Sequence, residues 1–477
     1  MIRPKFDGTL CTEPEGLMFE TKECGNSFPT SFWETYSAFA NTSGGTVALG
    51  IREMSYGLEV VGVKDPPKII KEMWDAINNR EKVSANILCE SDIAGVDVEG
   101  KTIILINVPR ASKDRRPVYI NGSVENGTFK RNGEGDYHCS REEIDEMVRD
   151  AGSRSPDSVV ISGLSIDDFE QSSIESFRNI MVSVRPGSRW NKEPRDEFLR
   201  LIGAADRGED GIIRPTLAGL LMFGSDSDIS RHLSGYLVDL RIYSGGDEWS
   251  ERFVSGTGEW SGNLFDFFTE VNARLFVKTP KPFKLDGAVR VDDNEFMKAE
   301  RELVLNGIVH ADYYLSTGVR VLIHPDRLVV ENPGTFRIPI SKAGKGGISD
   351  PRNKNLMGMF RLIGMVENSG QGVKRIVDTC RELGIPDPEF LEETDPSRVI
   401  CTLPMWDGVD RAVLTNRETK ILEIMLRGGN ETMTDMAKEL GTSQSTVSRT
   451  VRGLQDKGLV RRESGKRGAR WVVFGRQ

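Results

Sequence analysis

Three polar side chains interrupt an apolar, helix-like segment, "RELVLNGIVHADYY", at residues 301–314. Glu302, Asn306 and His310 are spaced four residues apart, so a helix would stack them in one row on one face. Such a row either faces a ligand or forms a buried, hydrogen-bonded brace. We expect His310 to be a structural histidine, and Glu302 and Asn306 to be the pair to examine.

A second set of residues suited to ligand binding lies in "RNKNLMGMFRLIGMVENSGQGVKRI", at residues 352–376. Gly370 and Gly372 precede a predicted helix. The first N–H groups of a helix have no partner within it and can donate to a phosphate. We therefore predict an anion-binding turn at these two glycines.

The segment "TMTDMAKELGTSQSTVSRTVRGLQDKGLV" has the spacing of a helix-turn-helix. Ala437 is the small residue where two helices cross, Gly441 makes the turn, and Val447 seats the second helix. Side chains on the start and exposed face of that helix would reach base edges or phosphates in a major groove. They are Gln444, Ser445, Thr446, Ser448, Arg449 and Arg452.

The chain then continues as "LVRRESGKRGARWVVF", which predicts a two-stranded wing. Its expected phosphate contacts are Arg461, Arg462, Lys466, Arg467 and Arg470. A winged helix can also serve protein contacts. Serine, threonine and arginine on the exposed helix face favour double-stranded DNA over a protein partner.

Charge supports the same interpretation of the C-terminal segment. The whole chain carries −9, but residues 411–477 hold 14 Lys and Arg against 7 Asp and Glu. A basic segment of +7 therefore follows an acidic body of −16. This asymmetry is expected where one module contacts phosphate.

Residues 297–380 resemble the divergent GHKL-type ATPase domain of bacterial regulators once described as related to RecG helicase. Glu302 and Asn306 fit the E-x-x-x-N helix of that family, and "HPDRLVVENPGTF" and the segment with Gly370 and Gly372 fit its later motifs. The resemblance implies ATP and Mg²⁺, with Glu302 polarising water and the Asn306 carbonyl helping to ligate the metal. It also implies cofactor contacts from Asn332, Gly334, Gly370 and Gly372.

The sequence departs from this family at the adenine-binding motif. Working members carry D-x-G-x-G, whereas this chain has "ENPGT" with Glu331, Asn332 and Gly334, and with Pro333 between them. The expected adenine contact from an aspartate is therefore missing. We expect nucleotide binding, with weak ATP hydrolysis as an open alternative.

The N-terminal part resembles the Schlafen-type AlbA-like domain. The resemblance is carried by "FETKEC" and "SAFANTSGGTVALGI", and by the later "RRPVYINGSVENGTFKRNGE". It implies nucleic-acid binding, and Gly44 and Gly45 would make a tight helix-to-strand turn.

Some Schlafen relatives are RNA nucleases that hold a divalent metal with two glutamates five apart and a later acidic residue. Glu15 and Glu20 have that separation here, and Glu53 follows "ALGI". Three carboxylates can bind Mg²⁺ or Mn²⁺ and activate water. Glutamate and lysine on an edge strand are also ordinary surface residues.

Composition and length set the frame for these motifs. At 477 residues the chain is too long for one core, and 38% hydrophobic with 28% charged residues is typical of globular proteins. Six cysteines without C-x-x-C spacing and four histidines suggest neither a zinc site nor a disulfide framework. No apolar stretch of about 18 residues occurs, so we expect a cytoplasmic protein without membrane contact.

We predict an α/β (α+β) multidomain fold in three parts. Residues 1–150 form the AlbA-like domain, residues 159–405 a linker region plus the GHKL-like α/β sandwich, and residues 411–477 the winged helix. The expected function is a DNA-binding transcriptional regulator, a homodimer whose nucleotide state modulates DNA engagement, with RNA as a further possible partner. The alternatives are a metal-dependent nuclease in phage defence and a scaffold without chemistry.

Overall fold

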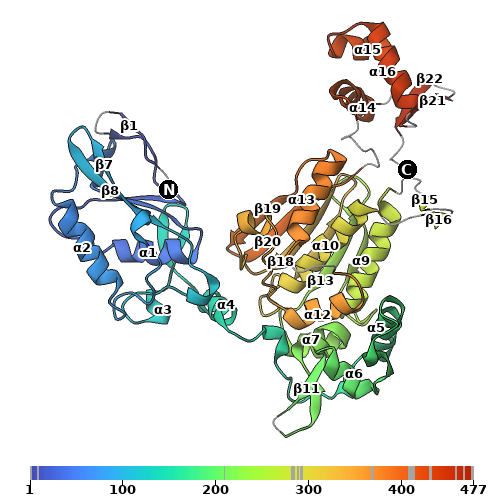
Figure 1. The fold of residues 1–477 in the computed structure, drawn as a ribbon, viewed down its shortest axis with the longest axis horizontal. Coiled ribbons are helices and arrows are strands. Elements are labelled where there is room, and N and C mark those ends of the chain that lie inside the picture. The colour runs from blue at the N-terminus through green and yellow to red at the C-terminus, as the bar shows by residue number, and fades with distance from the viewer. Residues whose placement is uncertain are drawn as a thin grey trace. The chain divides into compact units, whose positions relative to one another are not determined.

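The protein is mixed α/β, as the computed structural model shows (Figure 1). Contacts divide it into two compact units, Met1–Arg154 and Ser155–Gln477, and each is considered by itself. The expected α/β multidomain class is confirmed. The structure describes residues 3–7, 10–208, 210–280, 285–286, 289–290, 294–366, 370–406, 414–428, 432–456, 459–465 and 468–473.

The first unit contains two four-stranded sheets and a hairpin. One sheet has the order β3 (Phe19–Lys22), β4 (Gly45–Leu49), β8 (Lys101–Val108), β7 (Ile93–Val98), with only β3 and β4 parallel. The other sheet has the order β1 (Phe6–Asp7), β2 (Leu10–Cys11), β6 (Gly57–Val60), β5 (Ile51–Met54). The remaining elements are β9 (Phe129–Asn132), β10 (Gly135–His138), α1 (Phe32–Asn41), α2 (Pro66–Ile77), α3 (Val124–Gly127), α4 (Arg141–Ala151), η1 (Glu90–Asp92) and η2 (Lys113–Arg115).

Helix α1 joins the two segments that carry the AlbA-like resemblance. The Ser37 hydroxyl donates to the Val118 carbonyl at 2.7 Å, and the Asn41 side chain both accepts from Val118 N at 2.8 Å and donates to Phe129 O at 3.0 Å. Thr42 Oγ1 accepts from Arg131 N at 2.9 Å. These polar side chains of "SAFANT" therefore satisfy buried backbone groups of the later segment, as burial requires.

The double glycine after α1 is required by close packing. A Cβ at Gly45 would lie 2.6 Å from the Phe39 ring. Gly44 has φ +77°, and a Cβ there would lie 2.8 Å from Val108 O. The helix-to-strand turn thus brings β4 against both α1 and β8 at distances that only glycine permits.

The second unit is built on a six-stranded sheet with the order β14-β13-β17-β18-β20-β19. Its strands are β13 (Val238–Tyr243), β14 (Trp249–Val254), β17 (Val319–Ile323), β18 (Arg327–Pro333), β19 (Glu389–Thr394) and β20 (Ser397–Pro404). Only β13 and β17 pair in parallel. Helices α9 (Leu264–Lys278), α10 (Glu295–His310) and α13 (Gly372–Leu383) lie on one side of it (Figure 1).

The two faces of this sheet differ because successive side chains of a strand point to opposite faces. Leu240, Val321 and Val330 are buried in the core with residues of α9 and α10. The alternate positions carry Asp239, Arg320 and Glu331, which lie side by side across three strands. We call the face that bears these three residues the open face.

Other elements of the second unit extend or cover this sandwich. They are η3 (Pro156–Ser158), η4 (Ile166–Asp168), α5 (Gln171–Val184), η5 (Arg189–Lys192), α6 (Arg195–Leu201), β11 (Ala205–Arg207), β12 (Ile213–Pro215), α7 (Leu217–Phe223), α8 (Asp226–His232), β15 (Leu285–Asp286), β16 (Val289–Arg290), α11 (Ile340–Ala343) and α12 (Lys354–Leu362). No helix in the part of the chain that the structure describes is both long and apolar enough to cross a membrane.

The C-terminal elements form a winged helix with its own core. They are α14 (Asn416–Gly428), α15 (Met433–Glu439), α16 (Gln444–Asp456), β21 (Val460–Gly465) and β22 (Gly468–Val473). Ala437 and Val447 are buried in this core, and Gly441 has φ +61°, which favours glycine. The three residues therefore occupy the structural positions that their spacing predicts.

Helix α10 also carries a buried acid, Glu300, which is fully inaccessible to solvent. Burial raises the pKa of its carboxyl to about 8, although Thr279 Oγ1 donates to it at 2.7 Å. Its value in the unfolded chain is about 4.3. The folded state therefore keeps a proton that the unfolded state releases between these two values.

We expect the free energy of unfolding to fall as pH rises from about 4.3 to about 8 through this group. Glu300→Gln removes the ionisable group. The melting temperature of this variant should therefore rise relative to that of the wild type as pH increases. Thermal melts of both proteins at several pH values in this range measure the difference. A difference that is the same at every pH would show that Glu300 does not titrate in this way.

Candidate functional site

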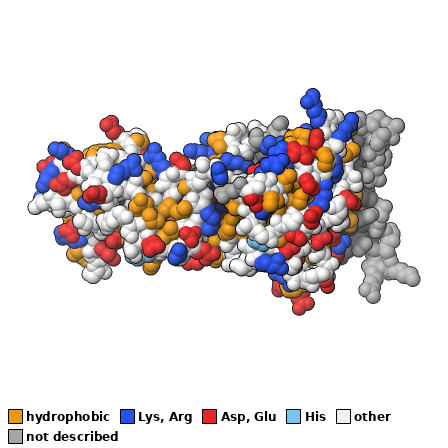
Figure 2. Space-filling view, turned by 90° about the horizontal axis from the view of Figure 1, so that it is seen from below, with side chains coloured by type: hydrophobic (Ala, Val, Ile, Leu, Met, Phe, Trp, Pro, Cys, Tyr) orange, Lys and Arg blue, Asp and Glu red, His pale blue; other side chains and the backbone are white. Residues whose placement is uncertain are grey.

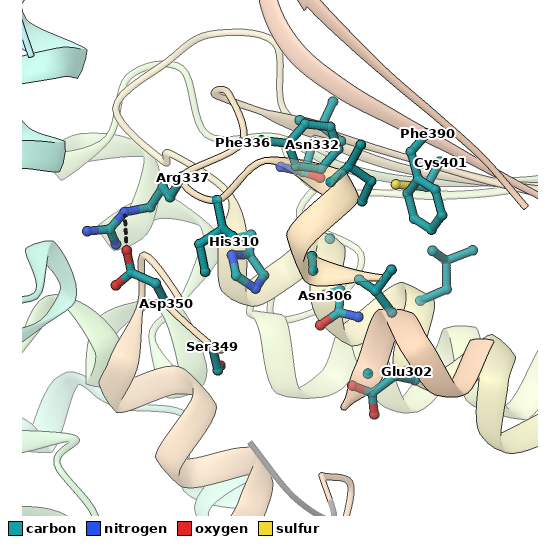
Figure 3. Close-up of a pocket in the computed structure, with 18 of the residues that line it drawn as sticks. Glu302, Asn306, His310, Asn332, Phe336, Arg337, Ser349, Asp350, Phe390 and Cys401 are labelled. Carbon is teal, nitrogen blue, oxygen red and sulfur yellow. Dashed lines mark ion pairs between the residues drawn. The ribbon is translucent and has the colours of Figure 1, made fainter. Parts of the chain in front are cut away.

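A pocket opens on the helix-covered side of the six-stranded sheet, with α10, β18, β20 and the start of α13 among its walls. Its empty volume is about 1000 Å³, including the open mouth. Glu302, Asn306 and His310 all line it (Figure 3). The row of polar residues on α10 therefore faces a pocket, and not only the interior of the protein.

The start of α13 lies directly against the first two of these residues. A Cβ at Gly372 would come within 2.1 Å of Glu302 Oε1 and within 3.2 Å of Asn306 Nδ2. Glycine is needed here for space, since a methyl group would displace the carboxylate. The amino end of a helix carries partial positive charge, which stabilises a nearby carboxylate. Glu302 and Asn306 thus meet the predicted anion-binding turn.

Gly370 completes this corner of the pocket. Its carbonyl accepts from Gly347 N at 2.7 Å, and its φ is +83°. A Cβ at this position would lie 2.9 Å from Ile348 N. The turn before α13 is therefore held against the glycine-rich loop at residues 344–347, so both predicted glycines are positioned by tertiary contacts.

Asn332 lines the pocket on the side away from Glu302 in Figure 3, together with Phe336, Phe390 and Cys401. It lies on β18 and is 5% exposed. The neighbouring Glu331 points to the open face, where its carboxylate pairs with Arg320 at 3.3 Å and Arg398 at 3.5 Å. Asn332 and Thr335 are the polar residues of "ENPGT" that line the pocket, so this motif offers a carboxamide and a hydroxyl there and no carboxylate.

Gly334 is a predicted cofactor contact that does not line the pocket, whereas the other predicted contacts do line it. It has φ +97°, and a Cβ there would lie 2.3 Å from Arg352 Nη1. Arg352 Nη1 in turn donates to the His310 carbonyl at 2.6 Å. Gly334 therefore lets a buried arginine reach the end of α10, which is a structural role.

The pocket also contains polar residues that no sequence motif indicated. Arg337 and Asp350 form an ion pair, with 3.5 Å between Nε and Oδ2 (Figure 3). Phe336 N donates to Glu392 Oε2 at 3.0 Å. The glycine-rich loop at residues 344–347 lies between Phe336 and Asp350 in the sequence. This loop was the sequence feature that could have indicated that the segment belongs to the site.

The three carboxylates of the nuclease hypothesis have separate surroundings. Glu15 Oε1 accepts from Thr21 N at 2.9 Å, and Glu20 accepts from Arg131 Nη2 at 2.7 Å and from Lys22 Nζ at 2.6 Å. Glu53 is exposed on β5. Among the described residues, no group of three or more His, Cys, Asp or Glu is placed to hold a metal ion. The structure does not bring Glu15, Glu20 and Glu53 into one metal site.

Helix α16 presents the predicted DNA-contacting residues at its surface. Val447 and Val451 are fully buried in the core of the winged helix. The other side of the helix carries Gln444, Ser445, Ser448, Arg449 and Arg452, all exposed, and Thr446, which is half-buried. The buried valines therefore hold α16 so that its polar and basic side faces solvent.

The wing is described in part. Arg462 is exposed on β21, with its guanidinium carbon 5.6 Å from the centre of the Trp471 ring. Arg461 and Arg470 lie in β21 and β22, and their side chains are outside the description. Lys466 and Arg467 lie outside the described residues.

Four parts of the chain match known protein families. Residues 15–140 match "Schlafen, AlbA_2", residues 145–239 a domain of unknown function (DUF8451), residues 316–401 "Putative ATP-dependent DNA helicase recG C-terminal", and residues 414–470 the MarR family. The expected domain architecture is confirmed. The AlbA-like domain, the divergent ATPase-like region and the winged helix follow one another along the chain.

Two similar solved structures come from bacteria. The DIP2311 protein from Corynebacterium diphtheriae has 20% identity and a TM-score of 0.42, over 98% of this chain and 94% of its own. The N-terminal domain of a RecG-related protein from Nitrosomonas europaea has 25% identity and a TM-score of 0.19, over 25% of this chain and 82% of its own. No curated protein matches the sequence.

Because Gly372 packs directly against Glu302, one added methyl group at residue 372 should lower the stability of the protein. Gly372→Ala should destabilise the second unit by about 1 to 3 kcal/mol, as overpacking of a filled site usually does. Gly358→Ala on α12 is the matched control, because a Cβ there meets nothing within 4 Å. It should stabilise the helix by about 0.5 to 1 kcal/mol. Thermal and urea denaturation measure both, and similar melts would contradict the packing argument.

Proposed function

We propose that the protein is a DNA-binding regulator that engages double-stranded DNA through its winged helix. The observation that carries this proposal is α16, whose buried seam of Val447 and Val451 fixes an exposed face with Arg449 and Arg452. A helix presented in this way fits the major groove, where serine, glutamine and arginine side chains read base edges or bind phosphates. The match to the MarR family and the charge of +7 over residues 411–477 support it.

Net charge outside the winged helix does not favour DNA binding. The chain outside the winged helix carries −16. In the face of the molecule shown in Figure 2, acidic and basic side chains are interspersed. Affinity for DNA rests mainly on neutralised phosphates, so a segregated basic module is the better candidate.

We further propose that the pocket of the second unit binds a nucleotide, with ATP and Mg²⁺ as the first candidates. The pocket fits such a ligand in two respects: the amino end of α13 lies beside a glycine turn, and α10 supplies adjacent carboxylate and carboxamide groups. A bound Mg²⁺–ATP supplies a phosphoanhydride and a divalent charge. The match of residues 316–401 to the recG C-terminal family supports this proposal.

Each residue of the pocket then has a distinct task. In this proposal the Asn306 carbonyl ligates the metal, and the N–H groups at Gly370 and Gly372 bind phosphate oxygens. Glu302 polarises a water molecule in this proposal, which allows weak hydrolysis. Asn332 offers the base both a donor and an acceptor, where an aspartate would only accept.

Regulation follows if the ligand joins α10 to α13. A nucleotide that contacts both helices would stabilise one conformation of the second unit. It shifts the equilibrium between two conformations only if it binds one of them more tightly. The winged helix follows β20 in the sequence, so that shift would reach the DNA-binding module through the body. We propose that nucleotide state modulates DNA engagement in this way.

The first test addresses the winged helix. Arg449→Ala should weaken binding to a cognate duplex by about 1 to 3 kcal/mol if the side chain reads a guanine, whereas Arg462→Ala should mainly reduce the salt dependence. Fluorescence anisotropy at several salt concentrations separates the two effects. Deletion of residues 411–477 should abolish binding. Retention of full affinity after that deletion would place DNA binding elsewhere.

The second test addresses the pocket. ATP with Mg²⁺, at about a hundred times its dissociation constant, should stabilise the second unit by about 2.7 kcal/mol. Asn306→Ala should remove the magnesium-dependent part of this shift. Glu302→Gln keeps the shape of the side chain beside Gly372, so it should retain the shift and lose any hydrolysis. A wild-type melt that no nucleotide moves would leave Glu302 and Asn306 as a structural brace.

A further inference from the structure

The amino end of α13 is a positive part of the pocket wall. The first N–H groups of a helix point out of this end and carry part of the helix dipole. The first turn contains Lys374 and Arg375 and no acidic residue, although Lys374 pairs with Asp378 in the next turn. The N-cap residue, Gln371, makes no side-chain cap bond. Within these described residues, the first turn of α13 therefore supplies no negative group at this end.

The negative group comes instead from α10. A Cβ at Gly372 would lie 2.1 Å from Glu302 Oε1 and 2.9 Å from the carboxyl carbon, so the carboxylate lies directly against the first turn of α13. Glu302 is 8% exposed, so water contributes little to balancing its charge. The carboxylate and the amino end of the helix therefore stabilise each other.

The same place is where the proposed nucleotide would have a phosphate. A phosphate bound at Gly370 and Gly372 would lie beside the Glu302 carboxylate, because that carboxylate already contacts Gly372. Two negative charges that are close together in a site with little water repel each other strongly. A metal-free nucleotide therefore has to overcome the charge of Glu302.

A divalent cation changes the sign of this interaction. Mg²⁺ is usually held by one or two carboxylates together with the phosphates of the ligand. Asn306 lies beside the carboxylate, with Nδ2 3.2 Å from the same Cβ position of Gly372. The side chain that adjoins Glu302 is thus a neutral carboxamide, which offers a metal ligand and adds no charge that would attract a free phosphate.

We propose that Glu302 makes the pocket selective for metal-bound nucleotides over metal-free ones. This inference rests on the proposed nucleotide binding and concerns the form of the nucleotide that binds. Without a ligand, the Glu302 carboxylate is the anion at the amino end of α13. It excludes a free polyphosphate by charge, and it admits the same polyphosphate when a divalent cation is bound with it.

Two simpler roles for Glu302 predict different behaviour. A structural brace would alter the stability of the unliganded protein without changing the preference for metal. A residue that only polarises water would affect hydrolysis and leave both binding constants unchanged. Selectivity for the metal-bound form is therefore a measurement that neither of these roles would change.

The test compares ATP with excess Mg²⁺ and ATP with EDTA, by isothermal titration calorimetry on the full chain. For the wild type, we expect the dissociation constant in EDTA to be at least about a hundredfold higher than in Mg²⁺. Glu302→Gln removes the charge and keeps the shape of the side chain beside Gly372. It should bind metal-free ATP more tightly than the wild type does, and so reduce this ratio to less than about tenfold. Glu302→Asp keeps the charge and should keep most of the ratio.

Glu331→Gln is the matched control, since it removes the same charge on the open face of the sheet, where Glu331 pairs with Arg320 and Arg398. It should leave the ratio unchanged. Thermal melts establish that the variants fold. The inference is wrong, and nucleotide binding stands, if the wild type binds ATP equally with and without Mg²⁺ or if Glu302→Gln retains the full ratio. Absence of binding by every protein in both conditions would overturn the nucleotide proposal together with this inference.

Discussion

The pocket depends on one close approach, that of Gly372 at the start of α13 to Glu302 and Asn306 on α10. Because no side chain separates them, the amino end of one helix meets a carboxylate and a carboxamide on another. The glycine turn at Gly370 is fixed against the loop at residues 344–347 by the same packing. The polar corner, the arrangement of α13 and the proposed phosphate contacts all follow from this approach.

The alternation of side chains in the six-stranded sheet separates two surfaces. On β18, Val330 and Asn332 face the pocket, while Glu331 faces the open face and pairs with Arg320 and Arg398. Consecutive residues of one strand therefore line the pocket on one side and form ion pairs on the other. A shift of one residue in this strand would exchange these two surfaces, so the register of β18 is strongly constrained.

In the first unit, the residues that carry the family resemblance hold the fold together. Ser37 and Asn41 satisfy backbone groups from Val118 to Phe129, and Arg131 binds Glu20, Asp136 and the Gly16 carbonyl. Glu20 is thus engaged by a buried guanidinium, which is 1% exposed. A distinctive motif can therefore reflect packing and hydrogen bonding as much as chemistry, and here the nuclease hypothesis gained no assembled site.

The sequence by itself determined what depends on local spacing. Four-residue steps placed Glu302, Asn306 and His310 on one helix face, and Ala437, Gly441 and Val447 positioned the helices of the winged helix. The sequence did not predict contacts between residues that are far apart in the chain. These contacts are Gly372 against Glu302, Gly334 against Arg352, Arg337 with Asp350, and Glu20 with Arg131. Periodicity fixes which side chains share a face, because it is a property of neighbouring residues. What that face meets is decided by packing between elements far apart in the chain, and so only the tertiary structure could supply it.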